Sequence, residues 1–456
     1  MTTKMISSIL LPLLWSATMA HAIPTVPQQP ESVPLPGPSL TIPVRANPDH
    51  VPDGPAALVA AYAKWNMPVP ELLANHMLTR RAGYWLTDIF VGGPDAQKIP
   101  VMIDTASPDF WLMSTDTVFG NAAVNGQPVL YDPSKSDSSQ EVAGATWKSM
   151  YCSSPLPYPS PPLPFLQNCL REETTYQAVA DDGSENSGKV YLDTVRIGLL
   201  TDNNRFSISN ATIQSVVTVS NRFASDPKLS GVLGLAKSRP SQVQPHMPAM
   251  MDRLRPELHY EWIGIDLRSN SDKGYFSFGY AMGSATVNEA PIADDEHWSF
   301  QLAGLRMSSM SDKVWYRLNT RVVATIDTGS SLLLLPSKLV AKYYSEIPES
   351  AHDPALQAYV FPCSVASGIP DFTFQTAGGY VGNIPKEFIN FGPVPRNSEK
   401  CFGGIQASAS GDRAIFGGVA LKNMYVQLNY GEQGSYVSFG NKGSLDVCST
   451  TSACDK

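Results

Sequence analysis

Two aspartates in short segments of the same pattern are the residues of this chain whose types and spacing could do chemistry. Asp104 ends an apolar run that begins at Val101, and Asp327 ends a run that begins at Val322. The first is followed by Thr-Ala-Ser and the second by Thr-Gly-Ser, which predicts a buried strand that stops at a tight turn and presents a carboxylate. One such turn is ordinary composition. Two copies that lie 223 residues apart, about the length of a compact lobe, indicate a repeated unit.

Two carboxylates held within hydrogen-bonding distance cannot both ionise easily, so the pair shares one proton over a broad acidic range. One carboxylate then acts as a base that activates water, and the other as an acid that protonates a peptide carbonyl. The roles can interchange between half-reactions, so the pKa values belong to the pair. This chemistry needs no histidine, serine, metal or cofactor. It predicts acid–base catalysis by Asp104 and Asp327 below neutral pH.

The composition describes a globular protein with room for two lobes and for processed segments. The chain has 456 residues, of which 43% are hydrophobic and 16% charged. The formal net charge of −8 argues against a nucleic-acid partner. We therefore expect no nucleic-acid partner.

Short apolar or alternating runs, separated by Gly, Pro, Asn and Asp, fill the chain from Trp85 onward and predict an all-β fold. No dinucleotide fingerprint, phosphate-binding loop or Gly-x-Ser-x-Gly motif occurs. A polar turn near 266–273 predicts a boundary between an N-terminal lobe, residues 82–267, and a C-terminal lobe, residues 268–456.

The first 22 residues predict a secretory signal peptide. Lys4 precedes an apolar run over 5–19, and Ala20-His21-Ala22 is a small-x-small cleavage site. No other stretch is long enough to cross a bilayer, and the polar tail carries no lipid-anchor signal. We expect a secreted, extracellular protein with no membrane partner.

Residues 23–81 predict a propeptide. The segment 23–56 is dense in proline and predicts extended, poorly packed chain, followed by helix-prone pieces at 56–64 and 72–80. The pair Arg80-Arg81 then lies just before the first recognisable strand, and we interpret it as a processing site. The alternative is a basic pair at a solvated helix end.

Six cysteines fall into three pairs of sequence neighbours. With a signal peptide, an even number suggests disulfides, although the connectivity cannot be proven from sequence. Short Cys-x-x-Cys spacings are absent and the seven histidines are scattered, so a zinc site is disfavoured. The neighbouring pairs are Cys152–Cys169, Cys363–Cys401 and Cys448–Cys454.

Two further surface features stand out. The loop 152–169 is rich in proline and predicts a stiff insertion, which could instead form a cleft rim or bind a partner. Asn210-Ala211-Thr212 is an N-glycosylation sequon.

The segments around both aspartates, together with Gly231–Ala236 and Ala414–Gly418, resemble the pepsin-like aspartic proteases. The likeness is greatest to secreted fungal acid proteases of the aspergillopepsin and penicillopepsin type, and it covers about residues 82–446. It implies an all-β, bilobal fold with an active-site cleft between the lobes. It also implies a monomer with peptide or protein substrates and endopeptidase activity on extended, mostly apolar segments. It also identifies Cys363–Cys401 as the second-lobe disulfide.

The resemblance assigns roles to further residues. Thr105 and Thr328 would brace the two loops beneath the aspartates, Ser107 and Ser330 would hydrogen-bond the outer carboxylate oxygens, and Gly329 would complete the second turn. Trp111 matches the tryptophan behind the flap, the hairpin that closes over substrate in this family. Lys64 matches a propeptide lysine that pairs with the aspartates, although an exposed lysine is the simpler reading.

Two features depart from the family pattern. Ala106 replaces a glycine, so its methyl group crowds a tight turn, and the loss would be larger if the turn needed a positive φ. In the favoured alignment Ala180 replaces the flap tyrosine, with Asp182 and Gly183 in the flap. Asp182 would then help accept lysine beside the scissile bond, or be an ordinary turn residue. The other alignment makes Tyr151 the flap tyrosine, with the loop 152–169 inserted into the flap.

These departures leave a second function open. The chain could be a secreted peptide- or protein-binding homologue that has lost efficient turnover. Both aspartates, both threonines and both serines of the paired motifs are present, however, and favour an enzyme.

Overall fold

A computed structural model describes most of the chain beyond residue 39. The described residues are 40–48, 51–65, 67–70, 73, 84–119, 126–150, 185–198, 206–268, 273–280, 288–307, 315–409, 411–431 and 434–442. They belong to one compact unit, Pro38–Lys456. The predicted signal peptide lies outside them.

The described residues are mostly strands, which confirms the all-β prediction. The largest sheet has the order β10-β6-β7-β8-β4-β9-β3-β2-β1-β12-β11-β25-β26-β13, with β5 beside β7. Its strands are β1 (Leu40–Ala46), β2 (Trp85–Val91), β3 (Gln97–Asp104), β4 (Phe110–Val118), β5 (Gln140–Glu141), β6 (Thr146–Met150), β7 (Glu185–Ile197), β8 (Phe206–Thr218), β9 (Gly231–Gly234), β10 (Val243–Gln244), β11 (Trp262–Leu267), β12 (Lys273–Phe278), β13 (Asn288–Pro291), β25 (Met424–Gly431) and β26 (Gly434–Asn441).

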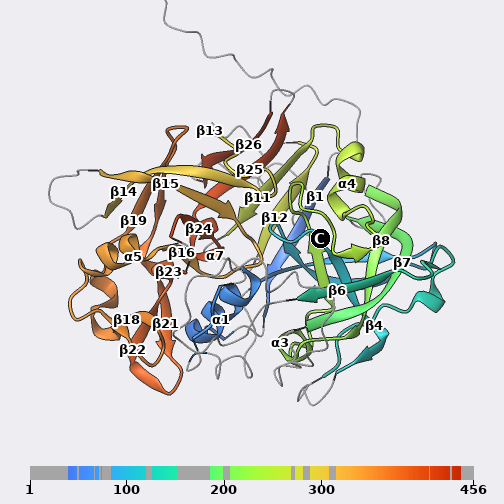
Figure 1. Ribbon diagram of the computed structural model, residues 1–456, viewed down its shortest axis with the longest axis horizontal. Coiled ribbons are helices and arrows are strands. Elements are labelled where there is room, and N and C mark those ends of the chain that lie inside the picture. The colour runs from blue at the N-terminus through green and yellow to red at the C-terminus, as the bar shows by residue number, and fades with distance from the viewer. Residues whose placement is uncertain are drawn as a thin grey trace, which may run out of the picture. The chain divides into compact units, whose positions relative to one another are not determined.

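Two smaller sheets follow in the second half of the chain. One has the order β20-β19-β14-β15-β24-β16-β23 and the other β17-β18-β22-β21. Their strands are β14 (Ser299–Met307), β15 (Tyr316–Ile326), β16 (Leu333–Pro336), β17 (Ala351–Asp353), β18 (Ala358–Pro362), β19 (Phe372–Thr376), β20 (Val381–Ile384), β21 (Asn390–Val394), β22 (Asn397–Gly403), β23 (Ile405–Ser408) and β24 (Arg413–Phe416). In Figure 1 these sheets lie on one side of α1, and strands β4 and β6–β8 lie on the other.

The helices are short. They are α1 (Gly54–Lys64), α3 (Asn221–Ala224), α4 (Met250–Leu254), α5 (Ser337–Tyr344), α6 (Lys386–Ile389) and α7 (Gly418–Leu421), with 3-10 turns at Pro133–Lys135, Arg255–Glu257 and Cys363–Gly368. No helix among the described residues is long and apolar enough to cross a membrane.

Each aspartate lies at the end of a strand or directly after it, and that strand pairs in parallel with one that ends at a glycine or directly before one. Asp104 ends β3 opposite Gly234 of β9, and the last residue of β15, Ile326, lies opposite Phe416 of β24. A Cβ atom on Gly234 would lie 2.4 Å from the carbonyl oxygen of Asp109. One on Gly417 would lie 2.4 Å from the carbonyl oxygen of Leu332. The two apolar-apolar-Gly segments therefore contain glycine because the backbone of each aspartate loop passes directly against them.

The prediction of poorly packed chain over 23–56 is wrong for Leu40–Ala46. This segment is β1, which pairs along its length with β12 and at its end with β2. Its alternate side chains Leu40, Ile42 and Val44 are at most 2% exposed. An apolar alternation with the period of a strand thus outweighs the proline content, because it lets one face bury in the core.

Helix α1 confirms the helix expected near 56–64 and begins two residues earlier. Its N-cap is Asp53, whose side chain accepts a hydrogen bond from the amide of Ala56 at 3.1 Å. Pro55 lies in the first turn, where its fixed φ suits a helix start.

The predicted lobe boundary at 267/268 falls in the connection between β11 and β12. These strands pair with each other in the largest sheet. That sheet also contains β3, which ends at Asp104, and β25 and β26 from the end of the chain. The sheet therefore joins the two halves of the fold.

Candidate active site

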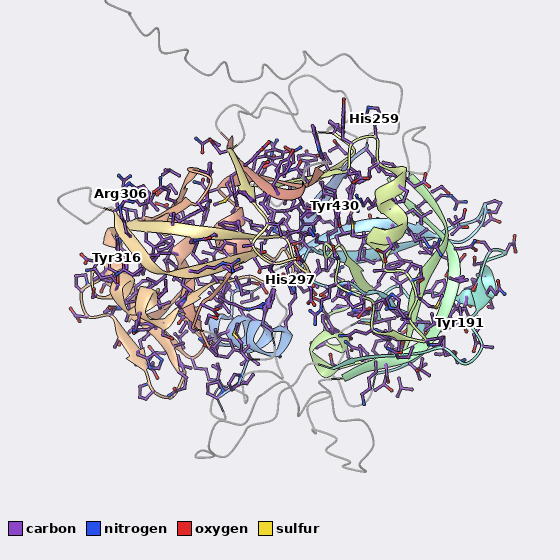
Figure 2. The ribbon with its side chains drawn as sticks, turned by 45° about the horizontal axis from the view of Figure 1, so that its top comes forward. Tyr191, His259, His297, Arg306, Tyr316 and Tyr430 are labelled. Carbon is purple, nitrogen blue, oxygen red and sulfur yellow. A yellow bond between two sulfur atoms is a disulfide. The ribbon has the colours of Figure 1, made fainter. Side chains whose placement is uncertain are left out.

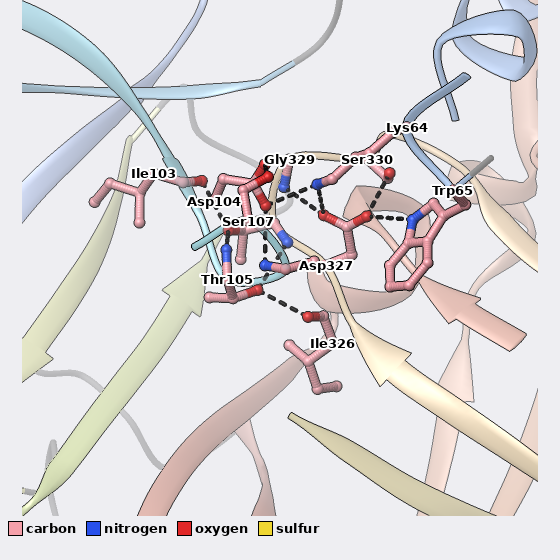
Figure 3. Close-up of polar contacts among 12 residues, drawn as sticks. Lys64, Trp65, Ile103, Asp104, Thr105, Ser107, Ile326, Asp327, Gly329 and Ser330 are labelled. Atoms are coloured by element: carbon pink, nitrogen blue, oxygen red, sulfur yellow. Dashed lines mark hydrogen bonds and ion pairs between the residues drawn. The ribbon is translucent and has the colours of Figure 1, made fainter. Parts of the chain in front are cut away.

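The loops that follow β3 and β15 are bound to each other by a symmetric set of hydrogen bonds. Thr105 Oγ1 donates to the carbonyl oxygen of Ile326 and Thr328 Oγ1 to that of Ile103, each at 2.8 Å. The amide of Thr105 donates to Thr328 Oγ1 at 3.2 Å, and the amide of Thr328 donates to Thr105 Oγ1 at 3.1 Å (Figure 3). Each threonine therefore fixes the position of the opposite loop.

Each carboxylate is held by its own loop in the same way. Asp104 accepts from the amide of Ala106 at 2.9 Å and from Ser107 Oγ at 2.6 Å. Asp327 accepts from the amide of Gly329 at 2.9 Å and from Ser330 Oγ at 2.6 Å. The two aspartates are 2% and 0% exposed. The structure thus brings together Asp104, Thr105, Ser107, Asp327, Thr328, Gly329 and Ser330.

Ala106 fits its turn without backbone strain. Among the described residues, the non-glycine residues with positive φ are Asn210, Glu349, Gln357 and Arg396. Ala106 is not one of them, so the larger penalty of a positive φ does not arise. Its counterpart Gly329 is more constrained, because a Cβ atom there would lie 2.7 Å from Cγ and Oδ2 of Asp104.

The end of helix α1 lies directly on the two carboxylates. Lys64 Nζ is 2.7 Å from Asp104 Oδ1 and 2.6 Å from Asp327 Oδ1. The next residue, Trp65, donates from Nε1 to Asp327 Oδ2 at 2.9 Å. The Lys64 side chain is 8% exposed, so the reading of an exposed lysine is wrong. Trp65 was missed, although its adjacency to Lys64 was a signal for it.

The ion pairs shift the pKa values of Asp104 and Lys64 in the direction opposite to that of burial. Burial alone would raise the pKa of Asp104, but Lys64, Ser107 and the Ala106 amide stabilise the charged form and lower that pKa below its ordinary value. Burial alone would lower the pKa of Lys64, but the two carboxylates raise it. One ammonium ion shared by two buried carboxylates is a stable arrangement at neutral pH.

A hydrophobic cluster holds α1 in this position. Tyr62 also donates to the carbonyl oxygen of Ala407 at 2.7 Å. The cluster joins Ala57, Leu58, Val59, Ala61, Tyr62, Met67, Val69 and Leu73 to Leu332, Leu334, Leu356, Ala358, Val360, Val394, Phe402 and Ile415. The segment that contains Lys64 is therefore packed against the C-terminal half of the fold.

Trp111 lies away from these carboxylate contacts, buried on β4. Its ring packs edge-on against Phe223 at 4.9 Å between centroids, and against Trp147 of β6 at 6.3 Å. Strand β6 pairs with the start of β7, Met150 opposite Glu185. The flap candidates Ala180, Asp182, Gly183 and Tyr151 lie outside the described residues.

The remaining predicted sites have different outcomes. The disulfide Cys363–Cys401 is present and links the start of a 3-10 turn to β22. Asn210 is exposed on β8. The other two cysteine pairs lie outside the described residues. In the described part of the chain, no three His, Cys, Asp or Glu residues gather as a metal site would require.

Comparisons with known proteins agree with this geometry. The sequence profile of the family described as "Eukaryotic aspartyl protease" matches residues 84–156 and 171–441. Endothiapepsin of Cryphonectria parasitica is 30% identical, over 84% of this chain and 86% of its own. Penicillopepsin-3 of Penicillium janthinellum is 31% identical over 75% of each chain. Aspergillopepsin-1 of Aspergillus fumigatus is 28% identical, over 84% of this chain and 87% of its own. The chain belongs to the eukaryotic aspartyl protease family and has its bilobal, all-β fold.

Proposed function

We propose that this chain is the inactive precursor of a secreted aspartic endopeptidase that works at acidic pH. One observation carries the proposal: two buried carboxylates, each held by an amide and a serine hydroxyl, face a single lysine ammonium between them. A pair of carboxylates this close can share a proton once the lysine leaves.

The residues then have the following roles. One of Asp104 and Asp327 takes a proton from water, and the other gives a proton to the carbonyl oxygen of the scissile bond. Water forms the new bond to the carbonyl carbon. The carboxyl group that took the proton from water then gives it to the nitrogen, whose bond to carbon breaks, while the other carboxylate takes a proton back from the diol oxygen. The threonine and serine contacts keep both carboxylates oriented through these steps.

The precursor organisation rests on several predictions. Residues 1–22 would be the signal peptide and 23–81 the propeptide, removed near Arg81. The contacts of Lys64 and Trp65 support this, because a segment bound on the carboxylates must leave before substrate can bind. Residues 82–267 and 268–456 would form the two lobes of a monomer, with glycosylation at Asn210 and bridges Cys152–Cys169 and Cys448–Cys454.

The pairing of Met150 with Glu185 supports Tyr151, rather than the position of Ala180, as the source of the flap tyrosine. In that alignment β6 and the start of β7 are the two strands of the flap. The family profile leaves residues 157–170 unmatched, as an insertion between these strands requires.

A binding protein without turnover is the less favoured function. Its support is Ala106 and the replacement of the flap tyrosine by Ala180. Ala106 has no positive φ, which weakens the first argument, and the alignment with Tyr151 weakens the second.

Peptide-library cleavage tests the proposal. The processed protein, without residues 23–81, is incubated with the library from about pH 3 to 7, the range that a shared proton should span. We expect cleavage in the acid half of this range. A folded, processed protein that cleaves nothing at any pH would overturn the protease function.

A further inference from the structure

His297 contacts Trp65, the residue that donates to Asp327, but is used by none of the chemistry above. Its ring packs against the ring of Trp65 with centroids 5.3 Å apart and planes tilted by 40°. Trp65 in turn donates to Asp327. His297 therefore borders the space that the Trp65 indole fills next to the active site, near the middle of the view in Figure 2.

His297 is 5% exposed. Among the residues that the structure describes, neither Nδ1 nor Nε2 of its imidazole has a hydrogen-bond partner. Nδ1 lies 3.4 Å from Asp294 Oδ2, near enough for charge attraction but without hydrogen-bond geometry. Buried polar groups in proteins are nearly always hydrogen-bonded. His297 has no hydrogen bond among the described residues and packs against Trp65, which belongs to the predicted propeptide. This arrangement points to a substrate group that takes the place of Trp65 and accepts a hydrogen bond from His297.

The departure of Trp65 would favour protonation of His297 by reducing its burial. Burial is the largest influence on His297 and lowers its pKa. Asp294 raises this pKa, whereas Arg239 and Arg413 lower it further. Removal of Trp65 admits solvent and so weakens the effect of burial, whereas Asp294 stays. Asp294 is itself satisfied, since it accepts from the amide of Glu296 at 2.9 Å and lies 3.6 Å from Arg413. Its charge is therefore partly offset by Arg413.

We propose that His297 is a specificity-determining residue of the processed enzyme, and that its imidazolium donates a hydrogen bond to a glutamate or aspartate side chain of the substrate. The proposal rests on the protease function given above. A space that holds an indole has room for a glutamate side chain. A charge-assisted hydrogen bond is stronger than a neutral one, so a carboxylate is favoured over an amide of the same shape.

The preference has a defined pH window. It requires an ionised substrate carboxylate, hence a pH above roughly 4.3, and a protonated imidazole, hence a pH below the pKa of His297 in the processed enzyme. Below this window the substrate loses its charge. Above it, His297 loses its proton.

Matched peptides test the proposal. Pairs that differ only by Glu or Gln at each of three positions on either side of the cleaved bond are compared from about pH 3 to 7, the range in which both groups titrate. We expect kcat/KM to favour Glu by about tenfold at one position, inside the window alone. The ratio for each pair is the readout because it is insensitive to a general loss of activity.

Variants identify the residue responsible. H297F and H297Q should both bring the ratio of kcat/KM for the Glu and Gln peptides to about one. H297Q is included because its polar side chain is compatible with folding if H297F does not fold. D294N should lower the upper edge of the pH window, since Asp294 favours the imidazolium. H259F is the control, because His259 is exposed and lies well away from His297 in Figure 2.

Two results would overturn the proposal: no position that distinguishes Glu from Gln, or a preference that persists in both His297 variants. If the processed protein cleaves no peptide, the protease function fails instead. Calorimetry then measures Kd for the same peptide pairs, and the ratio of Kd for the Gln peptide to that for the Glu peptide decides the role of His297.

Discussion

The amides of Ala106 and Gly329 lie at the same distance, 2.9 Å, from Oδ1 of the aspartate two residues before each. The two loops thus give their carboxylates equal support, although one carries a methyl group and the other none. The difference lies in what surrounds the Cβ position. At Gly329 that position is 2.7 Å from the Asp104 carboxylate.

Exchanging these residue types should have unequal effects. Ala106→Gly should change kcat/KM by less than about threefold, because the alanine backbone is unstrained. Gly329→Ala should lower it by roughly ten- to a hundredfold, the kinetic equivalent of about 1–3 kcal/mol of overpacking. Peptide cleavage by the processed variants measures both, with thermal unfolding as a check on folding. A large gain from Ala106→Gly would instead mean that the natural enzyme is impaired by its methyl group.

The contact of Lys64 with the carboxylates should be lost as the pH falls from neutral into the acid range. Because the pKa of Asp104 is lowered, this contact is fully present above the ordinary carboxylate pKa and is lost as the pH falls through the lowered one. The raised pKa of Lys64 means that alkali disrupts the contact only above the ordinary lysine value. We expect residues 54–65 to be released in acid and to stay bound at neutral pH.

Lys64→Met should weaken this binding by about 3–5 kcal/mol, since it leaves two buried carboxylates without their cation. Hydrogen exchange of the amides of 54–65 in the unprocessed protein measures the release. Exchange should begin at a higher pH than in the natural protein. Lys338→Met, on the exposed face of α5, is the control and should change nothing. Identical exchange in the two variants would contradict the role of Lys64.

The threonine hydroxyls should contribute stability as a unit. Thr105→Val removes a donor to Ile326 and an acceptor for the Thr328 amide, and should cost about 1–3 kcal/mol of unfolding free energy. Thr328→Val should cost the same. The double variant should lose less than the sum, because each single change already breaks the shared set of bonds. Thr105→Ser keeps the hydroxyl and is the control; equal unfolding of the serine and valine variants would refute this role.

The contacts of each aspartate with its own serine could be expected from the sequence because they are local and occur twice. Asp104 and Ser107 lie in one turn, and the second turn has the same order, so one pattern predicts both halves. The strand at Leu40–Ala46 was missed because its partner β12 lies over 220 residues away and proline composition suggested otherwise. His297 was missed because its contact with Trp65 depends on tertiary packing, which local pattern does not reveal.

The most direct measurement compares Asp104→Asn, Asp327→Asn and the double variant of the processed protein on one peptide at acid pH. Two carboxylates that share a proton act as a unit, so each single variant should lose all measurable cleavage and the double should be no worse. Asparagine keeps the side-chain oxygen that accepts from the Ala106 or Gly329 amide, so the loops should stay folded. If either single variant cleaved at the natural rate, the paired-carboxylate mechanism would be contradicted.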